Sequence, residues 1–170
     1  MVTLVDWQIL AAMNLTSDDG LKVEPFDLKL LGGHSLDVRL GDRLYDPATQ
    51  KMTTMTELDN GYVMQPGDFL LAHLLEKVHI PATMVCRLEG KSSLGRQGLK
   101  VHQTAGFIDG GFFGDITLEL SLVGSIPLRL VAGMRIGQLT FERTERPLRP
   151  YGHPDLGSKY QGQEGPTPAR

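Results

Sequence analysis

The sequence predicts a mainly β protein of one domain, with a short helix near the N-terminus. The chain has 170 residues, which is enough to bury a hydrophobic core within a single domain. Its 20 glycines and 10 prolines are well above the average share of about 12% for these two residue types. Several segments also alternate apolar and polar residues. These features favour many short strands joined by tight turns over a bundle of helices.

Composition and charge exclude several classes of protein. Apolar residues make up 41% of the chain and charged residues 22%, which is typical of a folded domain. The single cysteine, Cys86, excludes an intramolecular disulfide framework and a zinc site of several cysteines. The net charge of -3 argues against a broad nucleic-acid-binding surface. The sequence lacks a signal peptide and an apolar run of about 20 residues, so we expect a cytoplasmic protein without membrane partners.

The first half of the chain changes from helical to strand periodicity. Apolar residues recur at helical spacing over Asp6–Met13 and predict a helix there, with Asp6 as its capping residue. Leu36, Val38 and Leu40 alternate with polar residues and predict a half-buried strand. Two further segments are predicted from composition and length: a hairpin or surface loop over residues 45–61, and a strand or helix over residues 69–75.

The second half of the chain is predicted to consist of strands and tight turns until about Arg143. Residues 116–121 and 128–130 alternate apolar and polar side chains and predict two strands. Gly137 lies within an apolar stretch and indicates a β-bulge. Residues 147–170 are rich in proline, glycine and polar residues, so composition alone predicts a disordered tail.

Three segments could carry chemistry, and each also has a purely structural interpretation. Residues 90–96 combine a lysine, two serines and Arg96, which could hold phosphate or simply form a polar turn. Residues 105–114 contain four glycines, three phenylalanines and Asp109, so this turn could shape a pocket for a flat base or fill the core. Glu119 could act as a general acid and base, or could be a solvated residue on a strand.

In order and spacing, these segments resemble successive motifs of the dCTP deaminase family, within the dUTPase superfamily. The likeness rests on residues 90–96, 102–114, 117–119 and 133–139, and it continues through residues 149–151 and 158–168. It is strong over residues 90–170. It is weaker earlier in the chain, where residues 33–41 resemble an early strand of the family.

The resemblance implies a fold and a reaction. The family fold is a distorted jelly-roll β-barrel of the dUTPase type, here with a short N-terminal helix and a C-terminal lid arm. Residues 1–150 would form the barrel domain, and residues 151–170 the arm that closes over the nucleotide. The family assembles as a homotrimer whose sites are shared between subunits. It converts dCTP and water to dUTP and ammonia, with Mg²⁺ accompanying the triphosphate and without zinc; dTTP commonly inhibits it.

The resemblance also assigns roles to individual positions. Glu119 matches the catalytic glutamate, Ser92 matches a residue that positions the attacking water, and Asp109 matches the residue beside the deoxyribose 3′-hydroxyl. Mg²⁺ would be held mainly by phosphate oxygens, with no protein ligand. The positions that match nucleotide-binding residues are Lys91, Ser92, Ser93, Leu94, Gly95, Arg96, Asp109, Thr117, Leu118, Glu119, Gln138, Tyr151, Lys159 and Gln163.

Gly106 and Phe107 distinguish two branches of this family. Well-known bacterial deaminases that only deaminate have His-Arg at these positions. Gly106-Phe107 instead resembles the bifunctional branch, which also hydrolyses dUTP to dUMP and diphosphate. In that branch, the small Gly106 would leave room for a water near the α-phosphorus. The sequence therefore predicts a bifunctional dCTP deaminase and dUTP diphosphatase.

Several alternatives share parts of this pattern. A deaminase without diphosphatase activity would keep Glu119, whereas a plain dUTPase usually lacks a carboxylate at that position. A non-catalytic nucleotide-binding regulator could share the fold and the binding residues. A structural β domain without a ligand would leave the run of motifs unexplained. Turnover of dCTP and dUTP separates these possibilities.

Overall fold

The computed structural model describes residues 2–14 and 20–170, and its fold is mainly β, as predicted. Two short helices and three 3₁₀ turns (Leu28–Leu30, Met55–Glu57 and Pro154–Leu156) accompany the strands. The helices and strands are α1 (Asp6–Met13), α2 (Ser92–Gly95), β1 (Val2–Thr3), β2 (Lys22–Glu24), β3 (Leu36–Arg39), β4 (Arg43–Asp46), β5 (Lys51–Thr54), β6 (Tyr62–Met64), β7 (Phe69–His79), β8 (Met84–Gly90), β9 (Leu99–Lys100), β10 (Phe107–Ile108), β11 (Phe113–Leu122), β12 (Leu128–Leu130) and β13 (Arg135–Arg143).

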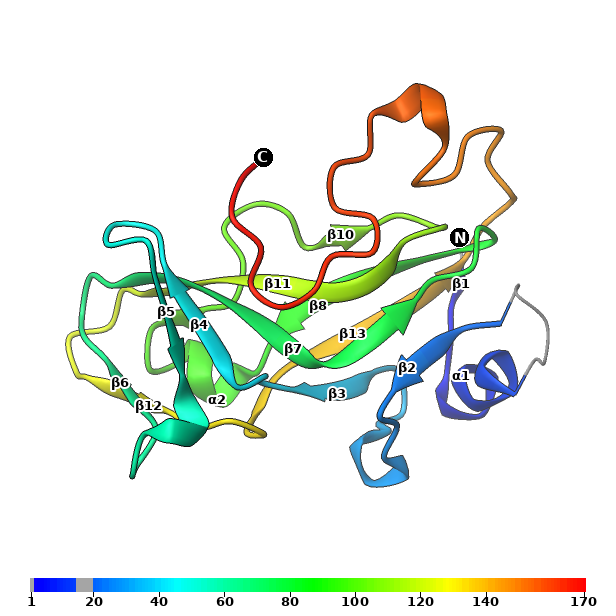
Figure 1. Cartoon of the computed structure of the whole chain (residues 1–170). Helices are drawn as coiled ribbons and strands as arrows, with labels where there is room; N and C mark the ends of the chain where they lie inside the picture. Colours follow the sequence, from blue (N-terminus) through cyan, green and yellow to red (C-terminus); the bar gives the residue numbers. More distant parts are fainter. Residues whose placement is uncertain (1, 15–19) are drawn as a thin grey trace.

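Two antiparallel sheets form the body of the molecule (Figure 1). The first has the order β1-β13-β8-β10, and β3 also pairs with β13. The second has the order β5-β4-β7-β11-β9, and β2 also pairs with β7, while β6 and β12 form a separate ribbon. Within the described residues, neither strand order closes into a ring, so the predicted barrel is corrected to open sheets. The edge strands β9 and β10 have only two residues each, which is too few to continue the hydrogen bonding around a barrel.

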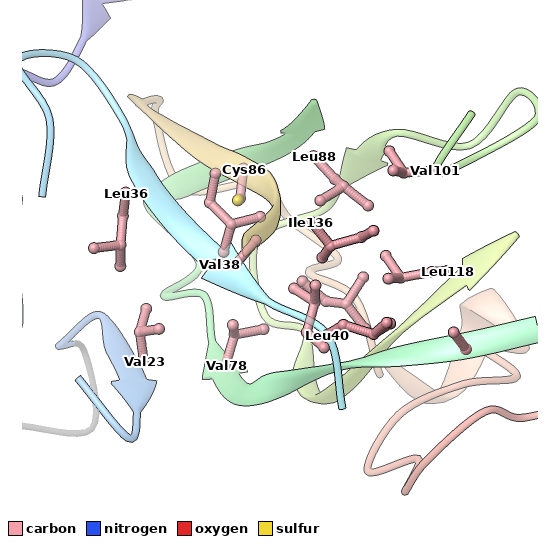
Figure 2. Close-up of a cluster of buried hydrophobic side chains, with 14 of the residues drawn as sticks. Val23, Leu36, Val38, Leu40, Val78, Cys86, Leu88, Val101, Leu118 and Ile136 are labelled. Carbon is pink, nitrogen blue, oxygen red and sulfur yellow. The ribbon is translucent and has the colours of Figure 1, made fainter. Parts of the chain in front are cut away.

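The hydrophobic core lies between the two sheets (Figure 2). Val38, Cys86 and Ile136 come from the first sheet, and Val78 and Leu118 come from the second. All five side chains are almost completely buried. Burial raises the pKa of the Cys86 thiol, because an apolar environment disfavours the charged thiolate.

The N-terminal helix has the predicted bounds, but its capping residue is Val5 rather than Asp6. The Val5 carbonyl accepts the Ile9 N–H at 2.9 Å, so the first hydrogen-bonded turn already includes this residue. Its own N–H donates to the Gln8 side chain at 3.0 Å. No helix in the described ranges is long and apolar enough to span a membrane.

The other segments for which the sequence predicts a structure contain strands. Residues 45–61 include most of the hairpin between β4 and β5, and the ambiguous apolar run is the start of the 11-residue strand β7. The predicted bulge is present, because the register of β13 against β3 shifts between Arg135 and Gly137. Along β11, the burial pattern places Thr117 and Glu119 on the face away from the core, as alternation predicts.

The C-terminal arm, defined as residues 151–170, is not a separate tail. In Figure 1 its red end runs beside β11. The Gly162 N–H donates to the Phe113 carbonyl at 2.9 Å, and the Asp115 N–H donates to the Gln163 carbonyl at 3.0 Å. The arm is therefore tied to β11 by backbone hydrogen bonds. The disorder predicted from composition is wrong, because the partners of the arm lie about fifty residues away in the sequence.

Candidate active site

A pocket of about 570 Å³ lies on the outer face of the second sheet. Its floor includes Phe69 and Leu71 of β7 together with Thr117 and Glu119 of β11. Residues 102–112 contribute to one wall, the β4–β5 hairpin to a second, and the arm to a third. The volume is within the range of ordinary small-molecule sites, which are mostly apolar with a few placed polar groups.

The carboxylate of Glu119 is the acidic group on the floor of this pocket. Glu119 lies opposite Leu71 in the β7–β11 register, and its side chain is half-buried. Its Oε2 atom accepts the backbone N–H of Gln103 at 2.8 Å. The Gln103 side chain in turn donates to the Glu119 carbonyl at 3.0 Å. These bonds fix the direction of the carboxylate and leave its second oxygen free to face a ligand.

The turn that carries Gly106 and Phe107 contributes to the first wall. The Phe107 ring is partly exposed, and the Arg87 guanidinium lies 4.9 Å from its centroid. A Cβ on Gly106 would approach the His102 ring at 2.8 Å and the Leu88 carbonyl at 3.0 Å. Only glycine therefore fits at position 106 without displacing His102. Asp109, at the end of this turn, also lines the pocket.

The β4–β5 hairpin supplies Tyr45 and Pro47 as the second wall. Its turn is held by the Asp46 carboxylate, which accepts the Thr49 hydroxyl at 2.7 Å and the Ala48 N–H at 2.8 Å. These hydrogen bonds hold the pKa of Asp46 below its ordinary value, because they favour the charged form. The turn thus places an aromatic ring and a proline at the pocket edge.

The arm contains three predicted residues, and two of them, Tyr151 and Gln163, belong to the third wall of the pocket. Tyr151 packs edge-on against Phe112, with 5.7 Å between the ring centroids. Gln163 is 8% exposed and donates to the Asp115 carbonyl at 2.7 Å. Lys159 lies outside the pocket, where its ammonium donates to the Arg170 carbonyl at 2.8 Å. A role for Lys159 on phosphate requires that this contact open.

The predicted phosphate-binding segment lies away from the pocket of its own chain. None of residues 91–96 lines the pocket. Ser92, Ser93 and Arg96 are exposed, whereas Leu94 is buried. The positions that the sequence predicts for the nucleotide thus form two separate groups on one chain.

The side chains of three predicted residues, Lys91, Gln138 and Leu118, are engaged elsewhere in the protein. The Lys91 ammonium donates to Asp37 at 2.7 Å, and the Gln138 side chain accepts the Ser35 hydroxyl at 3.3 Å. Neither Lys91 nor Gln138 lines the pocket. The Leu118 side chain is fully buried in the core, so this residue can present only its backbone to a ligand.

Sequence reasoning missed several residues that line the pocket, among them His102, Tyr45 and Tyr160. The Nδ1 atom of His102 is buried without a hydrogen-bond partner among the described residues. Tyr45 comes from a segment that the sequence indicates only as a hairpin or surface loop. His102 and Tyr160 lie within segments that resemble family motifs, but neither was assigned a role. Their placement depends on long-range pairing, so no local pattern in the sequence indicates it. The described part of the chain holds no group of three or more His, Cys, Asp or Glu residues that could bind a metal ion.

Sequence comparison identifies the family. A family model described as dCTP deaminase-like matches residues 3–144. The chain is 49% identical over 166 residues to a Corynebacterium diphtheriae protein named "dCTP deaminase, dUMP-forming", with 88% of each chain covered. Proteins of the same name match from Mycolicibacterium smegmatis (50% over 166 residues; 88% of this chain and 87% of the relative) and Corynebacterium jeikeium (46% over 183 residues; 98% and 95%).

Solved structures agree with this assignment. The 2′-deoxycytidine 5′-triphosphate deaminase from Agrobacterium tumefaciens matches with a TM-score of 0.67 and 25% identity, over 83% of this chain and 48% of that chain. A dUTPase of Staphylococcus bacteriophage 80alpha matches with a TM-score of 0.50 at 14% identity, over 76% and 93%, which concerns the fold alone. The family indicated by the sequence motifs is therefore confirmed, and the chain belongs to the dCTP deaminase-like family.

Proposed function

We propose that this protein hydrolyses dCTP to dUTP and ammonia, and then hydrolyses dUTP to dUMP and diphosphate in the same site. The observation that carries the proposal is the pocket that Glu119 and Phe107 both line. The relatives that match over 88% or more of the chain are named dCTP deaminase, dUMP-forming, which supports the same pair of reactions.

In the deamination step, Glu119 would act as the general base and then as the general acid. Its free oxygen takes a proton from a water molecule, and the resulting hydroxide forms a bond to C4 of the cytosine ring. The proton passes through Glu119 to the departing amino group, the C4–N bond breaks to release ammonia, and the proton of the new hydroxyl moves to N3 to give the uracil ring. The backbone N–H of Gln103 holds the carboxylate in place throughout this transfer. Ser92 and the backbone near Ala105 would position the attacking water.

The second step would take place beside the wall that contains Gly106 and Phe107. A water attacks the α-phosphorus, the bond from that phosphorus to the bridging oxygen breaks, and diphosphate leaves. A side chain at position 106 would displace His102, which lines the pocket, so glycine keeps the shape of the wall where this step is proposed. Asp109 would hold the deoxyribose 3′-hydroxyl at the same edge of the pocket.

The triphosphate would be held by residues that one chain does not bring to its own pocket. Lys91, Ser92, Ser93 and Arg96 lie in a separate region, which supports a homotrimer in which one subunit completes the pocket of the next. The contacts that Lys91 and Gln138 now make would open to admit phosphate. Mg²⁺ would neutralise phosphate charge when bound. Because the described residues form no carboxylate cage, phosphate oxygens and water would supply most of its ligands.

A product assay tests this proposal. The purified protein is incubated with dCTP and Mg²⁺, and in parallel with dUTP, and the nucleotides are separated by chromatography. We expect dUMP from both substrates. Accumulation of dUTP alone from dCTP would mean a deaminase without diphosphatase activity. Cleavage of dUTP with dCTP untouched would mean a dUTPase, and binding without turnover would favour a regulator.

A further inference from the structure

The hydrogen bonds that hold the C-terminal arm converge on Asp115 of β11. The Asp115 N–H donates to the Gln163 carbonyl at 3.0 Å, and the Asp115 carbonyl accepts the Gln163 side chain at 2.7 Å. The Asp115 Oδ2 atom accepts the Gly165 N–H at 2.7 Å. Asp115 is only 9% exposed, so its carboxylate is committed to the arm rather than to solvent.

His73 lies directly behind this carboxylate. It is opposite Thr117 on β7, its Nδ1 atom is 3.8 Å from Asp115 Oδ2, and its Nε2 atom is 3.5 Å from Asp42 Oδ1. Both ring nitrogens are buried and have no hydrogen-bond partner in the described part of the chain. A Cβ on Gly41 would overlap the imidazole, so the Gly41 backbone confines the ring to this orientation. Burial of a polar ring without a hydrogen bond lowers the stability of the folded state, so the position of His73 calls for an explanation.

The surroundings of this cluster carry further charges. The Arg43 Nε atom lies 3.8 Å from Asp42 Oδ1, and a Cβ on Gly165 would come within 2.8 Å of the Arg43 guanidinium. On the same face of β7, Lys77 lies 3.4 Å from Glu164 of the arm. The arm between residues 163 and 165 is therefore enclosed by the carboxylate of Asp115 and the guanidinium of Arg43.

We propose that Asp115 is a positioning residue that fixes the register of the C-terminal arm over the pocket, and that the His73 ring packed behind it limits the movement of its carboxylate. Asp115 does not line the pocket, but Thr117 and Glu119 follow it at every second residue on the same face of β11. The Thr117 hydroxyl accepts the Thr167 N–H at 3.2 Å, so the same row continues to guide the arm toward Glu119. The kinetic part of this inference rests on the proposed deaminase function.

Amide hydrogen exchange measured on the full-length protein tests the positioning directly. Loss of a buried hydrogen bond to a charged acceptor predicts about 10- to 100-fold faster exchange for the arm in Asp115→Ala. Exchange in β8 and β13 should stay unchanged. Asp115→Asn keeps an acceptor oxygen and should restore part of the protection, and His73→Phe should loosen the arm less than Asp115→Ala. The matched control is Glu76→Gln, a buried carboxylate of β7 that pairs with Arg39 at 2.7 Å and does not touch the arm.

Kinetics with dCTP supply the second measurement. If the arm is loosened, part of the binding free energy of dCTP is spent on ordering it. We therefore expect KM for dCTP to rise by about the factor by which amide exchange of the arm is accelerated, while kcat at saturation changes less than about threefold. Unchanged arm exchange in Asp115→Ala would overturn the proposal, whatever the activity. A loosened arm with unchanged KM would overturn the link to the pocket. If the wild-type chain does not turn over dCTP but Asp115→Ala still loosens the arm, the proposed function fails and the positioning role stands.

Discussion

The proposed catalytic carboxylate of Glu119 is oriented by a backbone N–H and not by a second charged side chain. The Gln103 N–H lies 2.8 Å from one carboxylate oxygen, and the Thr117 hydroxyl lies one step away on the same strand face. A neutral donor of this kind fixes geometry without forming an ion pair. A carboxylate held in this way can take up and release a proton during turnover.

The substitution Glu119→Gln tests this role. Glutamine keeps the shape and an acceptor oxygen for the Gln103 N–H but cannot transfer the proton. We expect kcat for deamination to fall by about 10²- to 10⁴-fold, with nucleotide affinity nearly unchanged. Turnover by chromatography and affinity by calorimetry check the two effects. Glu142→Gln, at a surface ion pair with Arg87, should remain fully active, and full activity in Glu119→Gln would refute the assignment.

Position 106 tests the second activity. Gly106→Ala adds a Cβ that meets the His102 ring and the Leu88 carbonyl, and the carbonyl belongs to β8 and cannot retreat. We expect dUMP formation from dUTP to fall more than deamination of dCTP. Gly33→Ala is a suitable control, because a Cβ at position 33 meets nothing within 4 Å. Equal losses of both activities in Gly106→Ala would argue against a role specific to the second step.

At the scale of elements, the structure joins the arm and the pocket through one strand. Residues 113–117 of β11 hydrogen bond to the arm, and Glu119 of the same strand faces the pocket. Tyr151 and Gln163 then line that pocket from the opposite side. The arm thus forms one wall of the site.

Removal of residues 151–170 tests the arm as an element. The strands of both sheets end before residue 151, so we expect the shortened chain to fold and to keep its β-sheet circular dichroism spectrum. Turnover of dCTP should be lost, because the pocket loses one wall and two predicted binding residues. A shortened protein with normal rates would show that the arm is dispensable.

The sequence predicts the strands in which apolar and polar side chains alternate, such as β3, β11 and β12, because alternation reports which side chains face the core. The outward placement of Glu119 follows from alternation within residues 116–121 alone. The arm could not be predicted from composition, since its partners are distant in the sequence: Tyr151 packs against Phe112, and the backbone of residues 162–165 bonds to β11. His73 and His102 were missed for a similar reason: each is placed by strand pairing or a turn that brings distant segments together.

At the scale of the whole molecule, the two groups of predicted nucleotide-binding residues lie on different parts of one chain. Residues 91–96 do not line the pocket that contains Glu119. If both groups bind one nucleotide, two copies of the chain must meet at each site. A closed homotrimer satisfies this requirement, because a head-to-tail contact repeats around the ring.

Mixed assemblies test this arrangement. Ser92→Ala and Glu119→Gln are co-expressed with different tags, and assemblies carrying both tags are purified. If a site combines residues 91–96 of one subunit with Glu119 of the next, every trimer that carries both tags keeps one intact site, which is roughly a third of its sites. Activity should therefore return in the mixture while each variant alone stays inactive. A mixture that remains inactive would place both groups in a site built by one chain.

The two-residue alternation of β11 also governs how the chain can change in length. Asp115, Thr117 and Glu119 share one face, and Ile116, Leu118 and Leu120 share the other. Insertion or deletion of one residue beyond Asp115 would turn Thr117 and Glu119 toward the core and bring apolar side chains outward. In the pairing of β7 with β11, three residues of β7 (74–76) lie opposite Ile116 alone. The irregularity therefore adds two residues to β7, and because two is an even number, the side chains on either side of it keep to the same faces of the sheet. Length variation within these strands should therefore occur in steps of two, whereas the turn after β11 is free to vary by single residues.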